Sequence, residues 1–256
     1  VIDINSPESV RSGIVDIEYV IVPVAQKEPL IQKVCIQKGT TCIDLSVSEK
    51  FIDESINLHT EAVQGGSLLL MAAGLFPGLS GIMAREVHSK TPNAILDVGL
   101  IQAKDAVAGS TGIADMLQLF NQNVDYLVST GSITKNGFTF SKEFQFQNRF
   151  GIHKLMLANF IERKYLLERI DVRSNYWSAF DDKKFNALIA GLRKIGLLGL
   201  FEHPKYRMKL AQFLSRMKKV QQEETIGLFC RSEKENGISV LLESDYLTTA
   251  SCATAY

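Results

Sequence analysis

The chain has 256 residues, of which 46% are hydrophobic, so it can bury a large core and has room for two domains. Lysine plus arginine and aspartate plus glutamate both number 28, and this balance gives no electrostatic reason to expect a nucleic acid or an anionic membrane as partner. Small-molecule chemistry stays open. No apolar run has the length of a membrane span and the first residues do not resemble a signal peptide, which predicts a soluble cytoplasmic protein.

The first part of the chain alternates strand-like and helix-like segments. Ser6, Pro7 and Glu8 supply an N-cap, a first-turn proline and an early acid, and they predict a helix that runs to about Val15. The apolar run at residues 19–24 is typical of a strand buried on both faces of a parallel sheet. The short links predict a parallel α/β sheet, with strands at residues 1–4, 19–24, 42–46 and 68–73 and with helices at residues 30–38 and 51–64.

After Gly81 the predicted strands follow one another instead of alternating with helices. This order is typical of an antiparallel or mixed sheet, so a second domain of α+β type is expected. The predicted strands cover residues 94–103, pieces of 126–146 joined by a turn at 135–137, and a closing pair at 225–231 and 238–242. Helices are predicted over residues 112–121, 154–167, 183–198 and 206–222.

A loop rich in glycine, residues 73–81, follows the fourth predicted strand directly and leads into a helix-compatible run. Gly74 and Gly78 allow close approach of the backbone to a ligand, and Pro77 stiffens the turn. The N–H groups that open the next helix can face an anionic or polar group. Open α/β sheets bind ligands at such loops, although an ordinary Pro-Gly turn is the alternative interpretation.

Two motifs about thirty residues apart, Cys42-Ile43-Asp44-Leu45-Ser46 and Gly74-Leu75-Phe76-Pro77-Gly78, resemble the saccharopine dehydrogenase family. The resemblance is good from residue 1 to about 115 and continues loosely to the end. It implies a partial Rossmann-type NAD(P)-binding domain at residues 1–85, an α+β substrate and dimerisation domain at 86–242, and a C-terminal helix at 243–256 that returns to the first domain. The first strand, its glycine-rich turn and the second strand would precede residue 1.

The resemblance also implies which residues contact the cofactor, NAD or NADP. Asp3 and Ile4 would lie near the adenine, although Asp3 is equally suited to cap a helix or end a strand. Asp44 could orient a ribose or substrate group, or merely cap its strand. The other cofactor-binding residues implied are Val22, Pro23, Val24, Gly74, Pro77 and Gly78.

Other residues are candidates for the substrate side. Ser110 and Thr111 form a turn suited to a carboxylate or phosphate, with a plain helix cap as the alternative. Arg149 and His153 could bring charge to the same cleft, although surface positions are more common for such residues. Phe76 stands where the lysine-pathway reductase of the family carries an acid, which argues against saccharopine as the substrate.

The predicted function is hydride transfer between NAD(P) and a small amino-acid-like, carbonyl or imine substrate. Because Phe76 cannot transfer a proton, Asp44, His153, water or the substrate itself would have to do so. A non-catalytic dinucleotide-binding sensor or interaction protein is the main alternative. A flavin or nucleotide enzyme on a similar sheet is a third hypothesis that fold alone does not exclude.

A homodimer is also expected, through the sheet of the second domain. The argument is the alternation of four aromatic residues, which would give one strand face an apolar character unless a helix after Lys154 covers it: Phe138, Phe140, Phe144 and Phe146. The scattered cysteines are interpreted as reduced thiols, and the histidines show no zinc-binding spacing, so no metal site is predicted.

Overall fold

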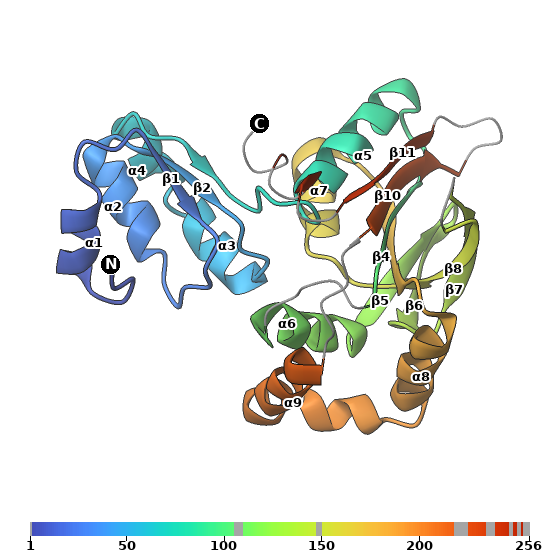
Figure 1. The fold of residues 1–256 in the computed structure, drawn as a ribbon. Helices are drawn as coiled ribbons and strands as arrows, with labels where there is room; N and C mark the ends of the chain where they lie inside the picture. Colours follow the sequence, from blue (N-terminus) through green and yellow to red (C-terminus); the bar gives the residue numbers. More distant parts are fainter. Residues whose placement is uncertain are drawn as a thin grey trace. The chain divides into compact units, whose positions relative to one another are not determined.

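The computed structural model describes residues 2–104, 110–146, 150–217, 225–233 and 239–245, together with residues 248, 249 and 252. The chain forms two compact units, unit 1 (Val1–Leu79 with Ala250–Tyr256) and unit 2 (Ser80–Thr249) (Figure 1). The fold is mixed α/β, with a Rossmann-like parallel sheet in unit 1 and a second, mixed sheet in unit 2. The fold class predicted from the sequence is therefore confirmed.

In the described part of unit 1, three strands form a parallel sheet in the order β1 (Tyr19–Val22), β2 (Thr41–Asp44) and β3 (Leu69–Leu70) (Figure 1). Helix α2 (Leu30–Lys38) ends as predicted at Gly39, whose φ of 68° is the left-handed conformation that favours glycine. The remaining helices of this unit are α1 (Pro7–Gly13), α3 (Glu49–Ile56) and α4 (His59–Gln64). The single helix expected at residues 51–64 is thus two shorter helices.

The sheet of unit 1 is covered on one face. Val22 and Cys42 lie in a core cluster with side chains of α1 and α2, and α4 joins α2 in a second cluster beside Leu69. On the opposite face, Tyr19 and Ile21 are 58% and 52% exposed. The expectation that β1 is buried on both faces is therefore wrong. Side chains of a strand point alternately to the two faces of the sheet, and these helices pack against only one face.

Residues 2–4 form no strand, contrary to the prediction. The N–H of Asn5 donates to the Asp3 carboxylate at 2.9 Å, and the N–H of Asp3 donates to the Ser9 hydroxyl at 2.9 Å. These local bonds satisfy backbone groups that a strand would pair with a neighbour. The segment is a turn that leads into α1, where Ser6 is the N-cap as predicted.

In the described part of unit 2, six strands form a mixed sheet in the order β11-β10-β4-β9-β8-β7 (Figure 1). Strand β4 pairs parallel with β9, and the other pairings are antiparallel. The strands are β4 (Leu96–Gln102), β7 (Ser141–Gln145), β8 (Ile152–Leu157), β9 (Ser174–Phe180), β10 (Thr225–Ser232) and β11 (Ser239–Asp245). The predicted closing pair is confirmed as the antiparallel pair of β10 and β11.

Two features of this sheet differ from expectation. Residues 154–157, expected to be helical, belong to β8, and the helix α7 (Glu162–Ile170) starts later. Strand β9 was not predicted, although all of its residues are buried. Its polar residues Ser174, Asn175 and Ser178 interrupt the apolar pattern, and pairing with both β4 and β8 buries them nevertheless.

Helices and a hairpin complete unit 2. The hairpin of β5 (Asn123–Val128) and β6 (Gly131–Asn136) contacts the sheet through Tyr126, whose ring lies 5.9 Å from that of Trp177 on β9. The helices are α5 (Leu79–Lys90), α6 (Ser110–Phe120), α7, α8 (Lys183–Lys194), the 3-10 helix η1 (Leu197–Phe201) and α9 (Pro204–Met217). The boundary expected at residue 85 falls inside α5. Strand β11 continues through Asp245, so no helix begins at residue 243.

The aromatic residues expected on an exposed strand face are mostly buried within one chain. Phe144 and Phe146 are 3% and 1% exposed and pack against Phe229. Phe138 lies in the turn after β6 and packs on Phe120 in a different cluster. The interpretation of these side chains as a dimer surface is therefore wrong, because Phe144 and Phe146 lie in the core of the mixed sheet and Phe138 lies in a core shared with α6 and α8. In the part of the chain that the structure describes, no helix has the length and hydropathy needed to cross a membrane.

Candidate functional site

The carboxyl ends of the three parallel strands of unit 1 lie side by side at one edge of the sheet. Val22 pairs with Asp44 in the register of β1 and β2, and the N–H of Leu45 donates to the Val22 carbonyl at 3.2 Å. The N–H of Ala73 donates to the Asp44 carbonyl at 2.9 Å. The structure thus places the end of β1 next to Asp44, and Asp44 next to Ala73 at the start of the glycine-rich loop.

The loop from Gly74 to Gly78 folds back on itself. Gly74 and Gly78 form a backbone bridge, and the N–H of Leu79 donates to the Gly74 carbonyl at 2.9 Å. Gly78 has a φ of 128°, and a Cβ there would lie 2.7 Å from the backbone nitrogen and carbonyl carbon of Gly74. The space beside Gly78 is therefore filled by the loop's own backbone, and not by room for a ligand. Pro77 is buried in the loop and Phe76 is half-buried.

Asp44 is enclosed at this edge. Its carboxylate accepts hydrogen bonds from the Gln32 amide at 2.7 Å, the Gln26 amide at 3.2 Å and the Ser46 N–H at 2.7 Å. Burial raises the pKa of Asp44, and the three hydrogen bonds act in the opposite direction. Because its side chain is wholly buried, Asp44 in this arrangement orients α2 and the segment after β1 and does not face solvent.

Gln26 and Gln32 were not singled out from the sequence. The available signal was Gln32, a polar residue at a position of α2 where the helical spacing of apolar residues predicts burial. A fully buried glutamine needs a polar partner, and the carboxylate of Asp44 provides it.

The remaining cofactor-binding candidates of unit 1 lie either directly after β1 or in the turn before α1. Pro23 and Val24 follow β1 and are exposed, Val24 to 47%. Asp3 is exposed in the turn before α1, and Ile4 packs at the margin of the core that α1 and α2 share. Asp3 and Ile4 therefore do not stand at the end of a strand, the position from which the adenine contact was inferred.

The candidates of unit 2 are only partly described. Ser110 and Thr111 open α6, and Arg149 lies outside the described residues. His153 lies on β8, is 4% exposed, and its Nε2 is 3.0 Å from the Phe180 carbonyl, so the Nε2–H tautomer donates this bond. The cleft expected between the loop at 74–81 and the turn at 109–112 stays a prediction, because the turn begins outside the described residues.

The environment of His153 predicts a pH dependence of stability. Burial lowers the pKa of His153 below its ordinary value of about 6.5. As the pH falls through this range, the unfolded chain therefore binds a proton on His153 before the folded chain does. The free energy of unfolding should then fall, by at most about 1.4 kcal/mol for each pH unit.

Urea denaturation at a series of pH values from about 8 to 5 measures this effect. His153→Gln should flatten the pH dependence, whereas the same change at the exposed residue His59 should leave it as in the wild type. Equal slopes in the wild type and His153→Gln would contradict the assignment.

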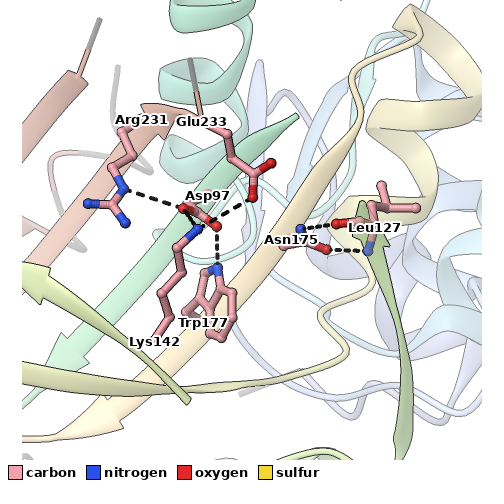
Figure 2. Close-up of polar contacts among 7 residues, drawn as sticks. All are labelled: Asp97, Leu127, Lys142, Asn175, Trp177, Arg231 and Glu233. Carbon is pink, nitrogen blue, oxygen red and sulfur yellow. Dashed lines mark hydrogen bonds and ion pairs between the residues drawn. The ribbon is translucent and has the colours of Figure 1, made fainter. Parts of the chain in front are cut away.

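A second polar cluster, not predicted from the sequence, lies in the mixed sheet (Figure 2). Asp97 on β4 is fully buried and accepts hydrogen bonds from Lys142 at 2.8 Å, from Trp177 Nε1 at 2.7 Å and from Arg231 at 3.3 Å. Glu233 lies 3.4 Å from Lys142. Two acids thus face two bases, and each base also lies over an aromatic ring. This balance is typical of a structural ion-pair network.

Among the described residues, no group of three or more histidine, cysteine, aspartate or glutamate side chains is placed to hold a metal ion. Cys35, Cys42 and Cys230 are buried free thiols and Cys252 is an exposed one.

Comparisons with known proteins give weak likenesses. No family model and no curated protein matches the chain. Among solved structures, a mutant meso-diaminopimelate dehydrogenase with DAP from Clostridium tetani E88 is similar at a TM-score of 0.39 and 11% identity, over 99% of this chain and 73% of that one. A proposed oxidoreductase of Bacillus subtilis, YvaA, is similar at a TM-score of 0.31 and 14% identity, over 70% and 50% of the two chains. These likenesses are too weak to carry an argument about function.

Proposed function

We propose that the protein is an NAD(P)-dependent oxidoreductase of the saccharopine dehydrogenase-like type. It would transfer hydride to or from a small amino-acid-like, carbonyl or imine substrate other than saccharopine. The observation that carries this proposal is the loop from Gly74 to Gly78, which follows a parallel strand and lies at the same sheet edge as residues 22–24. In open parallel sheets, this edge is where ligands bind.

The residues at this edge suit a dinucleotide. Pro23 and Val24 give an exposed apolar surface at the end of β1, against which a flat ring can pack. Asp44 lies beneath that surface and holds Gln26, which belongs to the segment after β1. We therefore assign Pro23 and Val24 to direct contact with the ligand and Asp44 to the support of that contact. The cofactor, when bound, supplies the hydride.

The proposed reaction also needs a group that donates or accepts a proton. Phe76 offers no ionisable group, so the loop itself contributes none. Asp44 and His153 stay candidates, and both are held by hydrogen bonds in buried positions. Burial raises the pKa of Asp44, which is the direction that a general acid requires, whereas its three hydrogen bonds favour the ionised form. Water or a substrate group is the remaining source.

The proposal predicts that the full-length protein binds NAD(H) or NADP(H), with a dissociation constant on the order of 1 µM to 1 mM, and does not turn over saccharopine. Calorimetry with each dinucleotide and an absorbance assay of hydride transfer measure the two parts. Val24→Asp should weaken dinucleotide binding at least about tenfold, because it places a charge against the phosphate-bearing ligand.

Val15→Asp is the matched control, since Val15 is 53% exposed, close to the 47% of Val24, but lies before β1 and not after it. If Val24→Asp binds the dinucleotide with wild-type affinity, or if both variants lose the same affinity, the carboxyl end of β1 is not part of the binding site. Phe76→Asp is not expected to create activity on saccharopine, because a new carboxylate lacks supporting hydrogen bonds.

The second candidate function is a non-catalytic dinucleotide-binding sensor or interaction protein. Phe76 is the observation that favours it, because the loop lacks the acid of the lysine-pathway reductase. Dinucleotide binding without hydride transfer to any of a panel of amino acids, carbonyl compounds and imines would select this function. We also propose that the protein assembles as a homodimer, through a surface other than the buried phenylalanines. A monomer by light scattering at micromolar concentration would refute it.

A further inference from the structure

Charge is unevenly distributed along the chain, although lysine plus arginine and aspartate plus glutamate balance over its whole length. Residues 183–217, which include α8, η1 and α9, contain eight lysines and arginines and a single acid, Glu202. Five of the basic residues are exposed lysines: Lys183, Lys184, Lys194, Lys205 and Lys209. Within the part of the chain that the structure describes, none of these lysines forms an ion pair. This part of unit 2 is therefore strongly positive.

Six large apolar side chains are exposed among these lysines, by between 43% and 69%: Leu188, Ile195, Leu197, Leu200, Tyr206 and Phe213. Their spacing places them on one side of each helix. The pair on α8 and its C-cap and the pair on α9 are each seven residues apart, which is two helical turns. The pair on η1 is three residues apart, which is one turn of a 3-10 helix.

The same three elements bury a different set of side chains in unit 2. Ile189 of α8 and Leu198 of η1 belong to a core cluster with Phe120, and Ala211 of α9 belongs to a cluster with Ile113 of α6. Figure 1 shows α8 and α9 together with α6 at one end of unit 2. The exposed apolar side chains are therefore not needed for this core. An exposed apolar group of this kind marks an interaction surface.

The combination of lysines with large apolar side chains favours a membrane over other partners. The centres of protein interfaces are depleted in lysine, whose long side chain loses conformational freedom when it is fixed. A second copy of this chain would present the same positive charge and repel the first. At a fluid bilayer, apolar side chains enter the headgroup region while lysine ammonium groups stay hydrated beside the lipid phosphates.

We propose that α8, η1 and α9 form a surface that binds anionic phospholipid membranes reversibly. The six apolar side chains insert between lipid headgroups, and the exposed lysines lie beside the negative headgroups. Each basic residue near an anionic membrane strengthens binding about fivefold. The surface belongs wholly to unit 2, and the inference does not depend on the proposed function.

Cosedimentation with vesicles tests the surface as a whole. The full chain should bind vesicles of phosphatidylcholine and phosphatidylserine, mixed at about 2 to 1, at least about tenfold more tightly than vesicles of phosphatidylcholine alone. Added salt should weaken the binding, because ions screen the attraction between the lysines and the headgroups. Equal binding to both kinds of vesicle, or binding to neither, would overturn the proposal.

Charge reversal on α9 tests the lysines. Lys205→Glu with Lys209→Glu should weaken binding to the anionic vesicles at least about 25-fold, because two attractions are lost and two repulsions are added. Lys33→Glu with Lys38→Glu is the matched control, since it reverses two exposed lysines of α2 in unit 1. An equal loss in the two double variants would show that only the net charge matters and would overturn the assignment to this surface.

A second pair of variants tests the apolar side chains and leaves every lysine in place. Ile195→Ser with Leu200→Ser should weaken binding to the anionic vesicles at least about tenfold. The control is Ile82→Ser with Ile152→Ser, because these side chains are 68% and 61% exposed, against 69% and 64% for the first pair. Wild-type binding in Ile195→Ser with Leu200→Ser would overturn the insertion of apolar side chains.

Fluorescence of Tyr206→Trp measures insertion directly. The chain contains one tryptophan, Trp177, which is fully buried, so a second one at the exposed position 206 reports on its own surroundings. Its emission should shift to shorter wavelength with the anionic vesicles and stay unchanged with phosphatidylcholine alone. Cosedimentation without this shift would overturn insertion at α9.

A nucleic acid is the competing partner of a positive surface. A DNA duplex should bind the wild type more weakly than the anionic vesicles do, because it leaves the leucine and isoleucine side chains in water. The contrary result is tight binding of the duplex that is lost in Lys205→Glu with Lys209→Glu and kept in Ile195→Ser with Leu200→Ser. Together with no binding to vesicles, that result would overturn the membrane proposal.

Discussion

Replacing Gly78 with alanine should lower the free energy of unfolding by about 3 kcal/mol and abolish dinucleotide binding. Two effects add at this position. Residues other than glycine rarely adopt a φ of 128°, and the added Cβ would collide with the backbone of Gly74, which cannot rotate away as a side chain can. The loop would have to open, and with it the carboxyl edge of the sheet beside Asp44, which Ala73 contacts. Urea denaturation and calorimetry measure the two losses.

Gly131→Ala is the matched control for the backbone strain. Gly131 has a φ of 145° and no atom within 4 Å of the position of a Cβ, so alanine there should cost only the strain, about 1–2 kcal/mol. The difference between the two variants measures the collision with Gly74. If Gly78→Ala keeps wild-type stability and loses only ligand binding, the space beside Gly78 belongs to the ligand and not to the backbone of the loop.

Replacing Asp97 with alanine should lower the free energy of unfolding by about 3–5 kcal/mol. Asp97 is fully buried, and its removal leaves Lys142 and Arg231 without their shared carboxylate and Trp177 without an acceptor for its N–H (Figure 2). Glu233 can compensate for only part of the charge, since it contacts Lys142 at 3.4 Å. Urea denaturation measures the loss.

Glu143→Ala is the control for this second prediction. Glu143 also forms an ion pair in the mixed sheet, with Lys154 at 3.7 Å, but the two side chains are 63% and 67% exposed. An exposed pair contributes less than about 1 kcal/mol, because water and salt screen it. A loss of stability in Asp97→Ala no larger than that in Glu143→Ala would show that the buried network contributes little.

Several elements were predictable because the information lies within a few residues. Helix α2 has the predicted bounds, since Gly39 adopts the left-handed conformation that ends a helix. The N-cap of α1 at Ser6 is likewise local. The parallel order of β1, β2 and β3 follows from short links that carry helices between strands.

Other elements were missed because long-range pairing decides them. Strand β9 lies in the middle of the mixed sheet despite its polar residues. Its neighbour β4 comes from far earlier in the chain, and its other neighbour β8 is separated from it by α7. The apolar run at residues 155–157 fits a helix or a strand, and pairing of β8 with β7 and β9 selects the strand. Residues 2–4 look like a strand in composition, but Asp3 bonds to nearby groups instead.

The sequence by itself determined the alternation of strands and helices in unit 1, the glycine-rich loop after β3 and the closing pair of β10 and β11. Only the tertiary structure decided what the polar groups do. Asp44 is held by glutamines from another segment, and Asp97 accepts hydrogen bonds from residues of three other strands, two of them cations. Glu162 reaches the start of α5. The physical reason is that periodicity along the chain predicts which side chains are buried. A buried charge also needs hydrogen-bond or ion-pair partners, and contacts between distant segments determine which residues these are.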